Sequence, residues 1–197
     1  VVANGLGAKP LAQTASLPMQ ALRGQVTLIP QGGIPDIRLP LCREGYLTPA
    51  LDGWHCAGAS YDDDDDPLPR RECDTGNLRR LARLLDLPAR LADPHDLRAR
   101  VGFRAVPPDR LPMAGTLPDF ERAWTSGATQ FTHLPRLAGL HALLGYASRG
   151  IIWSALMAEL LASGLEGEPM PVEADLVDAV DPARFLLKAL RKGKGPA

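Results

Sequence analysis

Long apolar runs, paired cysteines and lysine are all scarce in this sequence of 197 residues. No stretch approaches the roughly 18 apolar residues that a membrane-spanning helix needs, and the first residues do not resemble a secretory signal. The three cysteines, Cys42, Cys56 and Cys73, lack the closely spaced pairs of a disulfide framework or a structural zinc site. We therefore expect a cytoplasmic protein without a membrane segment or a metal site.

A complete dinucleotide-binding loop is also lacking. Gly5-Leu6-Gly7 follows Val1-Val2, but the fingerprint needs a third glycine at position 10, where Pro10 stands. Proline there would also stop a helix from opening on a phosphate. We predict that the chain does not hold a dinucleotide's pyrophosphate by itself. Because Val1-Val2 looks like the end of a strand whose partners precede it, the sequence predicts a piece of a longer protein.

What is present indicates an α+β domain with a mainly antiparallel sheet. Hydrophobic residues make up 45% and charged residues 23%, which is ordinary for a globular protein. Asp52-Gly53 between two strand-like runs predicts a hairpin. Strands are expected at 1–8 (ending in a glycine turn), 23–29, 44–49, 54–60, 100–106 and 140–146, and helices at 72–87, 93–98 (short), 151–162, after Pro171 and from 181 to 191.

Three further expectations come from local composition. The run Asp62–Asp66 predicts a solvated loop, because like charges repel and resist packing. Residues 114–138 resemble a polar connector. Residues 151–162 are apolar nearly all round, which is typical of a buried helix.

Two features suggest a binding site. Arg104 lies inside the apolar strand RVGFRAV, so its charge needs either an internal partner such as Asp109 or an anionic ligand. Gly145 and Gly150 flank a turn that leads into the helix at 151–162, whose N-terminus would favour negative charge. From the residues alone, a buried strand, turn and helix in which the glycines serve only packing is the favoured explanation of the second feature, and the alternatives for both features stay open at this point.

Three segments carry a resemblance to a known family. GYLTPALDGWHCAGASYDDDD (45–65) and RVGFRAVPPDRLPMAGTLPD (100–119) resemble the glycine oxidase/D-amino acid oxidase superfamily. Residues 143–194 resemble the end of the C-terminal oxidoreductase domain of MnmC-type bifunctional tRNA-modification enzymes. The resemblance extends from residue 1 to about 194.

This resemblance implies a function. In that family an upstream segment supplies the FAD-binding glycine loop, and a methyltransferase domain that uses S-adenosylmethionine lies further upstream. The oxidoreductase removes the carboxymethyl group from a carboxymethylaminomethyl substituent on the wobble uridine of tRNA. Hydride leaves the glycine α-carbon for the flavin, and water splits the resulting imine into glyoxylate and the aminomethyl product.

The resemblance also assigns roles to residues and segments. Arg104 would clamp the substrate carboxylate, and Tyr46 would face the substrate cavity. The residues expected against the flavin ring are Gly145, Ser148, Arg149, Gly150 and Ile151. The implied organisation is a remnant of the FAD-binding domain at 1–8, a substrate-binding domain at 9–138, a return to the FAD-binding domain at 139–165, and a helical basic tail at 166–197. One departure is Ser154-Ala155, where the family tends to have Ala-Pro.

Two basic regions are candidates for contacting tRNA. The first is an arginine-rich helix with Arg70, Arg71, Arg79, Arg80 and Arg83, and the second is the tail with Lys188, Arg191, Lys192 and Lys194. Two alternative functions remain: a small-molecule glycine or sarcosine-type amino acid oxidase, and a non-catalytic module that binds RNA or protein.

Overall fold

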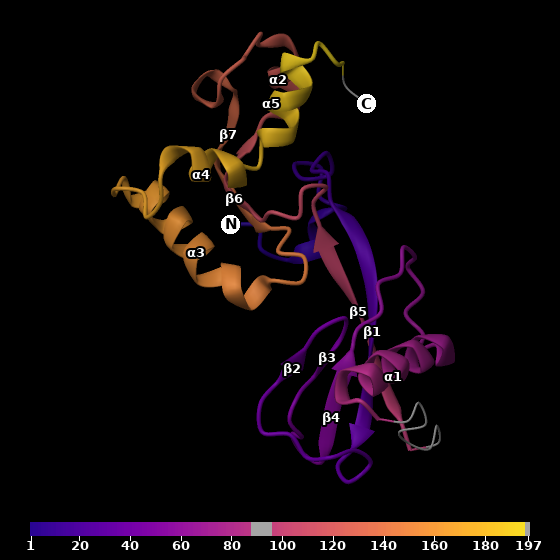
Figure 1. The fold of residues 1–197 in the computed structure, drawn as a ribbon. Helices are drawn as coiled ribbons and strands as arrows, with labels where there is room; N and C mark the ends of the chain where they lie inside the picture. Colours follow the sequence, from indigo (N-terminus) through magenta and orange to yellow (C-terminus); the bar gives the residue numbers. More distant parts are fainter. Residues whose placement is uncertain (88–95, 196–197) are drawn as a thin grey trace. The chain divides into compact units, whose positions relative to one another are not determined.

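The longest strand, β1 (Gln20–Pro30), organises a five-stranded sheet in the order β2-β3-β4-β1-β5. The computed structural model describes residues 1–87 and 96–195 (Figure 1). The other strands of this sheet are β2 (Leu41–Cys42), β3 (Tyr46–Leu47), β4 (Trp54–Gly58) and β5 (Arg98–Val106). β1 pairs with β4 in antiparallel register, with Val26 opposite Gly58.

The hairpin predicted around Asp52-Gly53 is confirmed. β3 and β4 are antiparallel, and Leu51 and Trp54 exchange backbone hydrogen bonds of 3.0 Å across the turn. Asp52 and Gly53 have φ angles of 51° and 81°. Two central residues with positive φ match the right-handed twist of the strands, which is why Asp-Gly favours this turn.

Helix α1 (Arg71–Leu85) covers this sheet, as its leucine spacing predicts. Leu81 is buried against Ile29, Leu47 and Ala57 of the sheet. The helix ends at Asp86, which adopts a left-handed conformation with φ 53°. The described residues of the predicted 93–98 segment are not helical, because Arg98 begins β5. Its first residues lie outside the described part of the chain.

A second core forms around an antiparallel strand pair, β6 (Met113–Pro118) and β7 (Arg136–Leu144). Val2 adds a parallel bridge to Ala142 of β7. Gly5–Ala8 form the 3-10 helix η1, so the glycine turn predicted there is a short helix. The fold class is confirmed as α+β with antiparallel sheets.

The prediction of a polar connector at 114–138 is wrong. β6, α2 (Phe120–Thr125), the 3-10 helix η2 (Phe131–His133) and the start of β7 occupy it. Gly115 and Pro118 interrupt the strand pattern of β6, which explains why sequence periodicity does not reveal it. The side chain of Asp119 caps α2 by accepting a 3.0 Å hydrogen bond from the Arg122 N–H.

The expectation of a fully buried helix at 151–162 is also wrong in the described structure. Helix α3 (Gly150–Glu166) buries only one face, where Met157 and Leu160 pack with Ala114 and Val180. Ile151 and Ile152, in its first turn, are 95% and 80% exposed. The two short helices predicted near the C-terminal end are confirmed as α4 (Ala174–Val180) and α5 (Arg184–Arg191).

The chain packs as two compact units. One contains residues 21–103, with most of the five-stranded sheet and α1. The other contains residues 1–20 and 104–197, with β6, β7 and the helices α2 to α5. None of the described helices is long and apolar enough to cross a membrane.

Candidate functional site

The strand that carries Arg104 is joined to the loop before α3. Arg104 is half-buried near the end of β5. The carbonyl of the next residue, Ala105, accepts a 3.0 Å hydrogen bond from the N–H of Ala147. The structure therefore brings together two regions that the sequence separates by about forty residues: Arg104 and the glycine loop 145–150.

Asp109, the acid that the sequence offered as a partner for Arg104, pairs with Arg184 of α5. The Arg184 guanidinium donates to both carboxylate oxygens at 2.7 and 2.9 Å, and to the carbonyl of Leu111 at 2.8 Å. Burial alone would raise the pKa of Asp109, but hydrogen bonds from Arg184 and from the Leu111 N–H outweigh it and lower the pKa. This pair fixes the loop that follows β5 onto α5.

Gly145 holds the glycine loop against the segment after β5. Its φ is +74°, and a Cβ atom there would lie 2.5 Å from Cγ of Pro107. Gly145 therefore has a packing role of its own, because any side chain would push the loop away from Pro107. Gly150 differs, since a Cβ there would meet only the Cβ of Tyr146, at 3.8 Å.

The first turn of α3 presents polar and apolar groups together. Arg149 is the N-cap residue, and its side chain makes no capping hydrogen bond. Ile151 and Ile152 lie exposed beside the N–H groups of that turn. A helix N-terminus favours negative charge, and exposed isoleucines favour an apolar surface. Ser148 and Arg149 complete the loop that leads into this turn.

These residues fit the ring end of a flavin, which is flat, largely apolar and carries negative charge at one edge when reduced. They do not complete a site for its pyrophosphate. Pro10 replaces the third glycine of the phosphate loop, and Gly5–Ala8 form a 3-10 turn whose Ala8 is fully buried. Among the described residues, no group of three or more histidine, cysteine, aspartate or glutamate side chains could hold a metal ion.

Tyr46 lies in the other unit, on β3 opposite Cys42. Its ring covers Gly58 of β4, where a Cβ atom would lie 2.9 Å from the Tyr46 hydroxyl. Burial raises the pKa of the nearby Cys56 thiol, and the Tyr46 side chain and Arg100 act in the opposite direction. Tyr46 is thus part of the surface of its own sheet, and its catalytic role stays a prediction.

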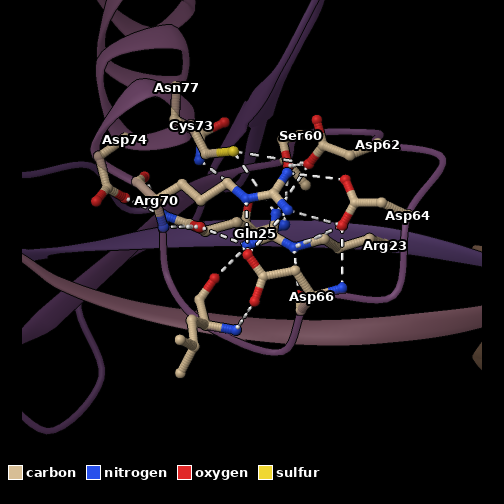
Figure 2. A network of polar contacts seen from close by, with 12 residues as sticks. Arg23, Gln25, Ser60, Asp62, Asp64, Asp66, Arg70, Cys73, Asp74 and Asn77 are labelled. Atoms are coloured by element: carbon tan, nitrogen blue, oxygen red, sulfur yellow. Dashed lines mark hydrogen bonds and ion pairs between the residues drawn. The ribbon is translucent and has the colours of Figure 1, made fainter.

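The sequence did not reveal a polar core in the unit of residues 21–103 (Figure 2). Arg23 is fully buried on β1. Its guanidinium donates to the Asp62 carboxylate at 2.9 Å and to the Gln25 side chain at 3.2 Å. It also donates to the carbonyls of Asp66 and Leu68 at 2.7 and 2.6 Å. The acidic run therefore wraps around a buried cation, and the prediction of a solvated loop holds for Asp63 and Asp65 but is wrong for Asp62, Asp64 and Asp66.

Alternate residues of the acidic run point inward, as in an extended chain. Arg70 binds Asp64 at 2.8 and 2.9 Å and Asp66 at 2.9 and 3.1 Å, while Asp63 and Asp65 are exposed. Hydrogen bonds to Arg70 and to backbone N–H groups lower the pKa of both inward carboxyls. The network fastens the start of α1 to β1, and it commits Arg70 to a structural role.

The class of protein to which this fold belongs is that of the FAD-dependent oxidoreductases. Residues 1–163 match the family described as FAD dependent oxidoreductase (DAO), and the chain belongs to this family.

The curated relatives are more specific. The chain is 46% identical over 192 residues to the tRNA 5-methylaminomethyl-2-thiouridine biosynthesis bifunctional protein MnmC of Aromatoleum aromaticum, covering 97% of this chain and 30% of that protein. The protein of the same name from Burkholderia thailandensis is 44% identical over 200 residues, covering 98% and 31%. The chain thus spans about 30% of the length of these relatives.

Solved structures show the same fold at lower identity. Iminodiacetate oxidase from Chelativorans sp. BNC1 superposes with a TM-score of 0.63 at 20% identity, covering 89% of this chain and 44% of that one. Glycine oxidase from Geobacillus kaustophilus gives a TM-score of 0.63 at 18% identity, covering 88% and 42%.

Proposed function

We propose that this chain is the substrate-binding portion of an FAD-dependent oxidase that removes the carboxymethyl group from carboxymethylaminomethyl wobble uridine in tRNA. The observation that carries the proposal is the hydrogen bond that joins the Arg104 strand to the glycine loop before α3. The chain that contains this hydrogen bond is similar over nearly its whole length to proteins named for 5-methylaminomethyl-2-thiouridine biosynthesis.

Arg104 has the chemistry for the first task, which is to bind the substrate carboxylate. A guanidinium holds a carboxylate with two parallel hydrogen bonds, so it fixes both the position and the orientation of the α-carbon. The substituent on the uridine is an N-alkyl glycine and carries such a carboxylate. Positioning of this kind can account for a large part of a rate enhancement without any proton transfer by the arginine.

The loop and the first turn of α3 would perform the second task, which is to receive the flavin ring. Gly145, Ser148, Arg149, Gly150 and Ile151 would lie against it. The α3 N-terminus would stabilise negative charge at the ring edge, and the exposed isoleucines would cover its apolar surface. When bound, FAD accepts the hydride that leaves the α-carbon.

The parts of the longer protein would divide as follows. Residues 1–8 and 139–165 would belong to the FAD-binding domain, 9–138 to the substrate-binding domain, and 166–197 to a helical basic tail. Other segments would supply the phosphate-binding glycine loop and a methyltransferase that uses S-adenosylmethionine. A tRNA substrate implies that the reaction takes place in the cytoplasm.

The test uses the full-length protein with FAD, as wild type, Arg104→Lys and Arg104→Ala. Loss of the visible absorbance of oxidised flavin is followed without oxygen after adding tRNA that carries the carboxymethylaminomethyl group, or a free N-alkyl glycine. We expect tRNA to bleach the wild-type flavin. Arg104→Ala should slow bleaching by about 100-fold, with Arg104→Lys in between, because lysine keeps the charge and loses the fork.

The two substrates separate the alternatives. Bleaching by the free amino acid alone would indicate a small-molecule oxidase. Bleaching by neither, in a protein that retains FAD, would leave the non-catalytic interaction module as the better account. If Arg104→Ala reacts with tRNA at the wild-type rate, the proposed role of Arg104 in binding the substrate carboxylate is refuted, whereas the proposed oxidase activity is not.

A further inference from the structure

An aromatic groove lies in the unit of residues 1–20 and 104–197, on the side of α2 and α5. Its volume is about 510 Å³, within the range of small-molecule sites. Phe120 and Trp124 of α2 and Phe185 of α5 line it, with Pro182 and Leu186. α2 and α5 lie side by side in Figure 1, and they share a buried cluster that includes Ala123 and Leu187.

Contacts with the α2–α5 cluster and with Arg184 hold the three rings in place. All three are half-buried, with Phe120 and Trp124 packed on the α2–α5 cluster. Arg184 stacks on Phe185 at 4.4 Å from the ring centre, and the Asp109 carboxylate fixes that guanidinium. Side chains that are ordered before a ligand arrives lose less entropy on binding, so this groove is prepared to accept a flat ring.

The segment that forms the C-terminal side of the groove is rich in positive charge. Residues 184–195 contain five basic residues and no acidic one: Arg184, Lys188, Arg191, Lys192 and Lys194. Lys194 lines the groove itself, and Lys188 is one helical turn beyond Phe185. Lys188, Lys192 and Lys194 are all exposed. Aromatic rings beside exposed cations can stack on a base and attract its phosphate at the same time. A purely apolar ligand would use only the rings, and a purely acidic one only the cations.

We propose that this groove binds an unpaired nucleotide of the RNA substrate, with its base stacked on Trp124 and its phosphates near Lys188 and Lys194. The inference rests on the proposed function, because it gives the tRNA a specific point of contact. The residues that line the groove differ from those proposed to contact the flavin and from Arg104. An experiment can therefore refute the nucleotide site without refuting the proposed oxidase function.

The test measures the dissociation constant of fluorescein-labelled tRNA for the full-length protein with FAD. The variants are Trp124→Leu and the double variant Lys188→Gln/Lys194→Gln. Phe131→Leu is the matched aromatic control, because Phe131 packs on the same cluster and does not line the groove. Lys9→Gln is the matched charge control.

We expect Trp124→Leu to weaken binding by about 10-fold or more, because stacking on one aromatic side chain contributes on that order. The double lysine variant should also bind more weakly, and it tests the groove even if Trp124→Leu folds poorly. Single-stranded oligouridylate should compete with tRNA better than an RNA duplex of equal charge, since only the former offers free bases.

Three outcomes would overturn the inference. Trp124→Leu and Phe131→Leu could weaken binding equally, which would indicate a packing effect. Both the Trp124 and lysine variants could bind like wild type. Trp124 could be inaccessible to a soluble quencher in the RNA-free protein, which would show that another segment fills the groove. If the wild-type protein oxidises tRNA and one of these outcomes is observed, the nucleotide site in the groove is refuted and the proposed function is not. If the wild-type protein itself does not oxidise tRNA, the proposed function is refuted instead.

Discussion

Arg23 is the residue whose burial is hardest to reconcile with its chemistry. An isolated charge in a protein interior is very unfavourable, and it is tolerated only where its hydrogen bonds and its charge are satisfied. Arg23 meets this condition because its donors reach a carboxylate, two carbonyls and an amide oxygen. The network therefore specifies one arrangement of the acidic run on β1.

Removing the carboxylate of Asp62 should destabilise this unit strongly. Asp62→Ala leaves the Arg23 charge buried without its 2.9 Å partner, and we expect a loss of about 3 kcal/mol. The measurement is the free energy of opening of the β1 amides, obtained by hydrogen exchange in the full-length protein. The neighbouring Asp63→Ala is the matched control, because Asp63 is exposed, and it should change the value by less than about 0.5 kcal/mol. Equal effects of the two variants would contradict a specific role for Asp62.

The polar side of β1 explains why the sequence could predict the strand but not its surroundings. RGQVTLI alternates, and alternation normally places polar residues toward solvent. Here the polar residues Arg23, Gln25 and Thr27 are fully buried, and they face the Asp62–Arg70 segment and α1. The pattern gives the period of a strand, whereas the direction of its polar face depends on partners about forty residues away.

At the scale of elements, the loop between β7 and α3 depends on Gly145. Gly145→Ala combines a strained positive φ with an approach of 2.5 Å to Pro107, so the loop must move. We expect the full-length variant to retain less FAD than wild type, measured as the ratio of flavin to protein absorbance. Gly150→Ala is the control for backbone strain, since its Cβ has room in this structure.

The two glycines then distinguish packing from contact with the cofactor. If only Gly145→Ala loses FAD, FAD binding requires the packing of the loop against Pro107. FAD loss in Gly150→Ala as well would indicate that the cofactor ring approaches the backbone at the start of α3. A Gly145→Ala protein with a full complement of FAD would contradict the proposed position of this loop.

Elements with a strong local sequence pattern were predicted correctly, whereas elements with a weak or interrupted pattern were missed. The leucine spacing of α1 and the Asp-Gly turn were sufficient on their own. β6 was missed because Gly115 and Pro118 break its pattern. The site followed mainly from resemblance. Composition left the role of Arg104 open, and the groove around Trp124 was not anticipated because it joins segments distant along the chain.

At the scale of the whole molecule, a net charge of −1 hides a basic end. Protein–RNA affinity falls with salt in proportion to the number of phosphates that basic residues neutralise. We expect the triple variant Lys188→Gln/Lys192→Gln/Lys194→Gln of the full-length protein to reduce the slope of log affinity against log salt. The reduction should be about 0.7 for each phosphate that the variant no longer neutralises.

The arginines of α1 provide the comparison for that measurement. Arg70 is bound to Asp64 and Asp66, and Arg83 lies 3.0 Å from Glu44, whereas Arg71 and Arg79 are exposed. Arg71→Gln/Arg79→Gln should leave the salt slope nearly unchanged. If this pair alters the slope and the lysine variant does not, the tRNA surface lies on α1 rather than on the tail.

The length of the acidic run has a consequence for inheritance. A run of one amino acid that is encoded by a repeated codon can gain or lose a unit when the gene is copied, and in a solvated loop such a change would have little effect on the fold. Here one end of the run is fixed by the paired backbone hydrogen bonds of Asp62 with Arg23, and the other by the grip of Arg70 on Asp66. Because inward and outward positions alternate, four or six aspartates would put the two ends out of step. A stretch that looks like the least constrained in the gene is therefore held to its present length by contacts at both ends.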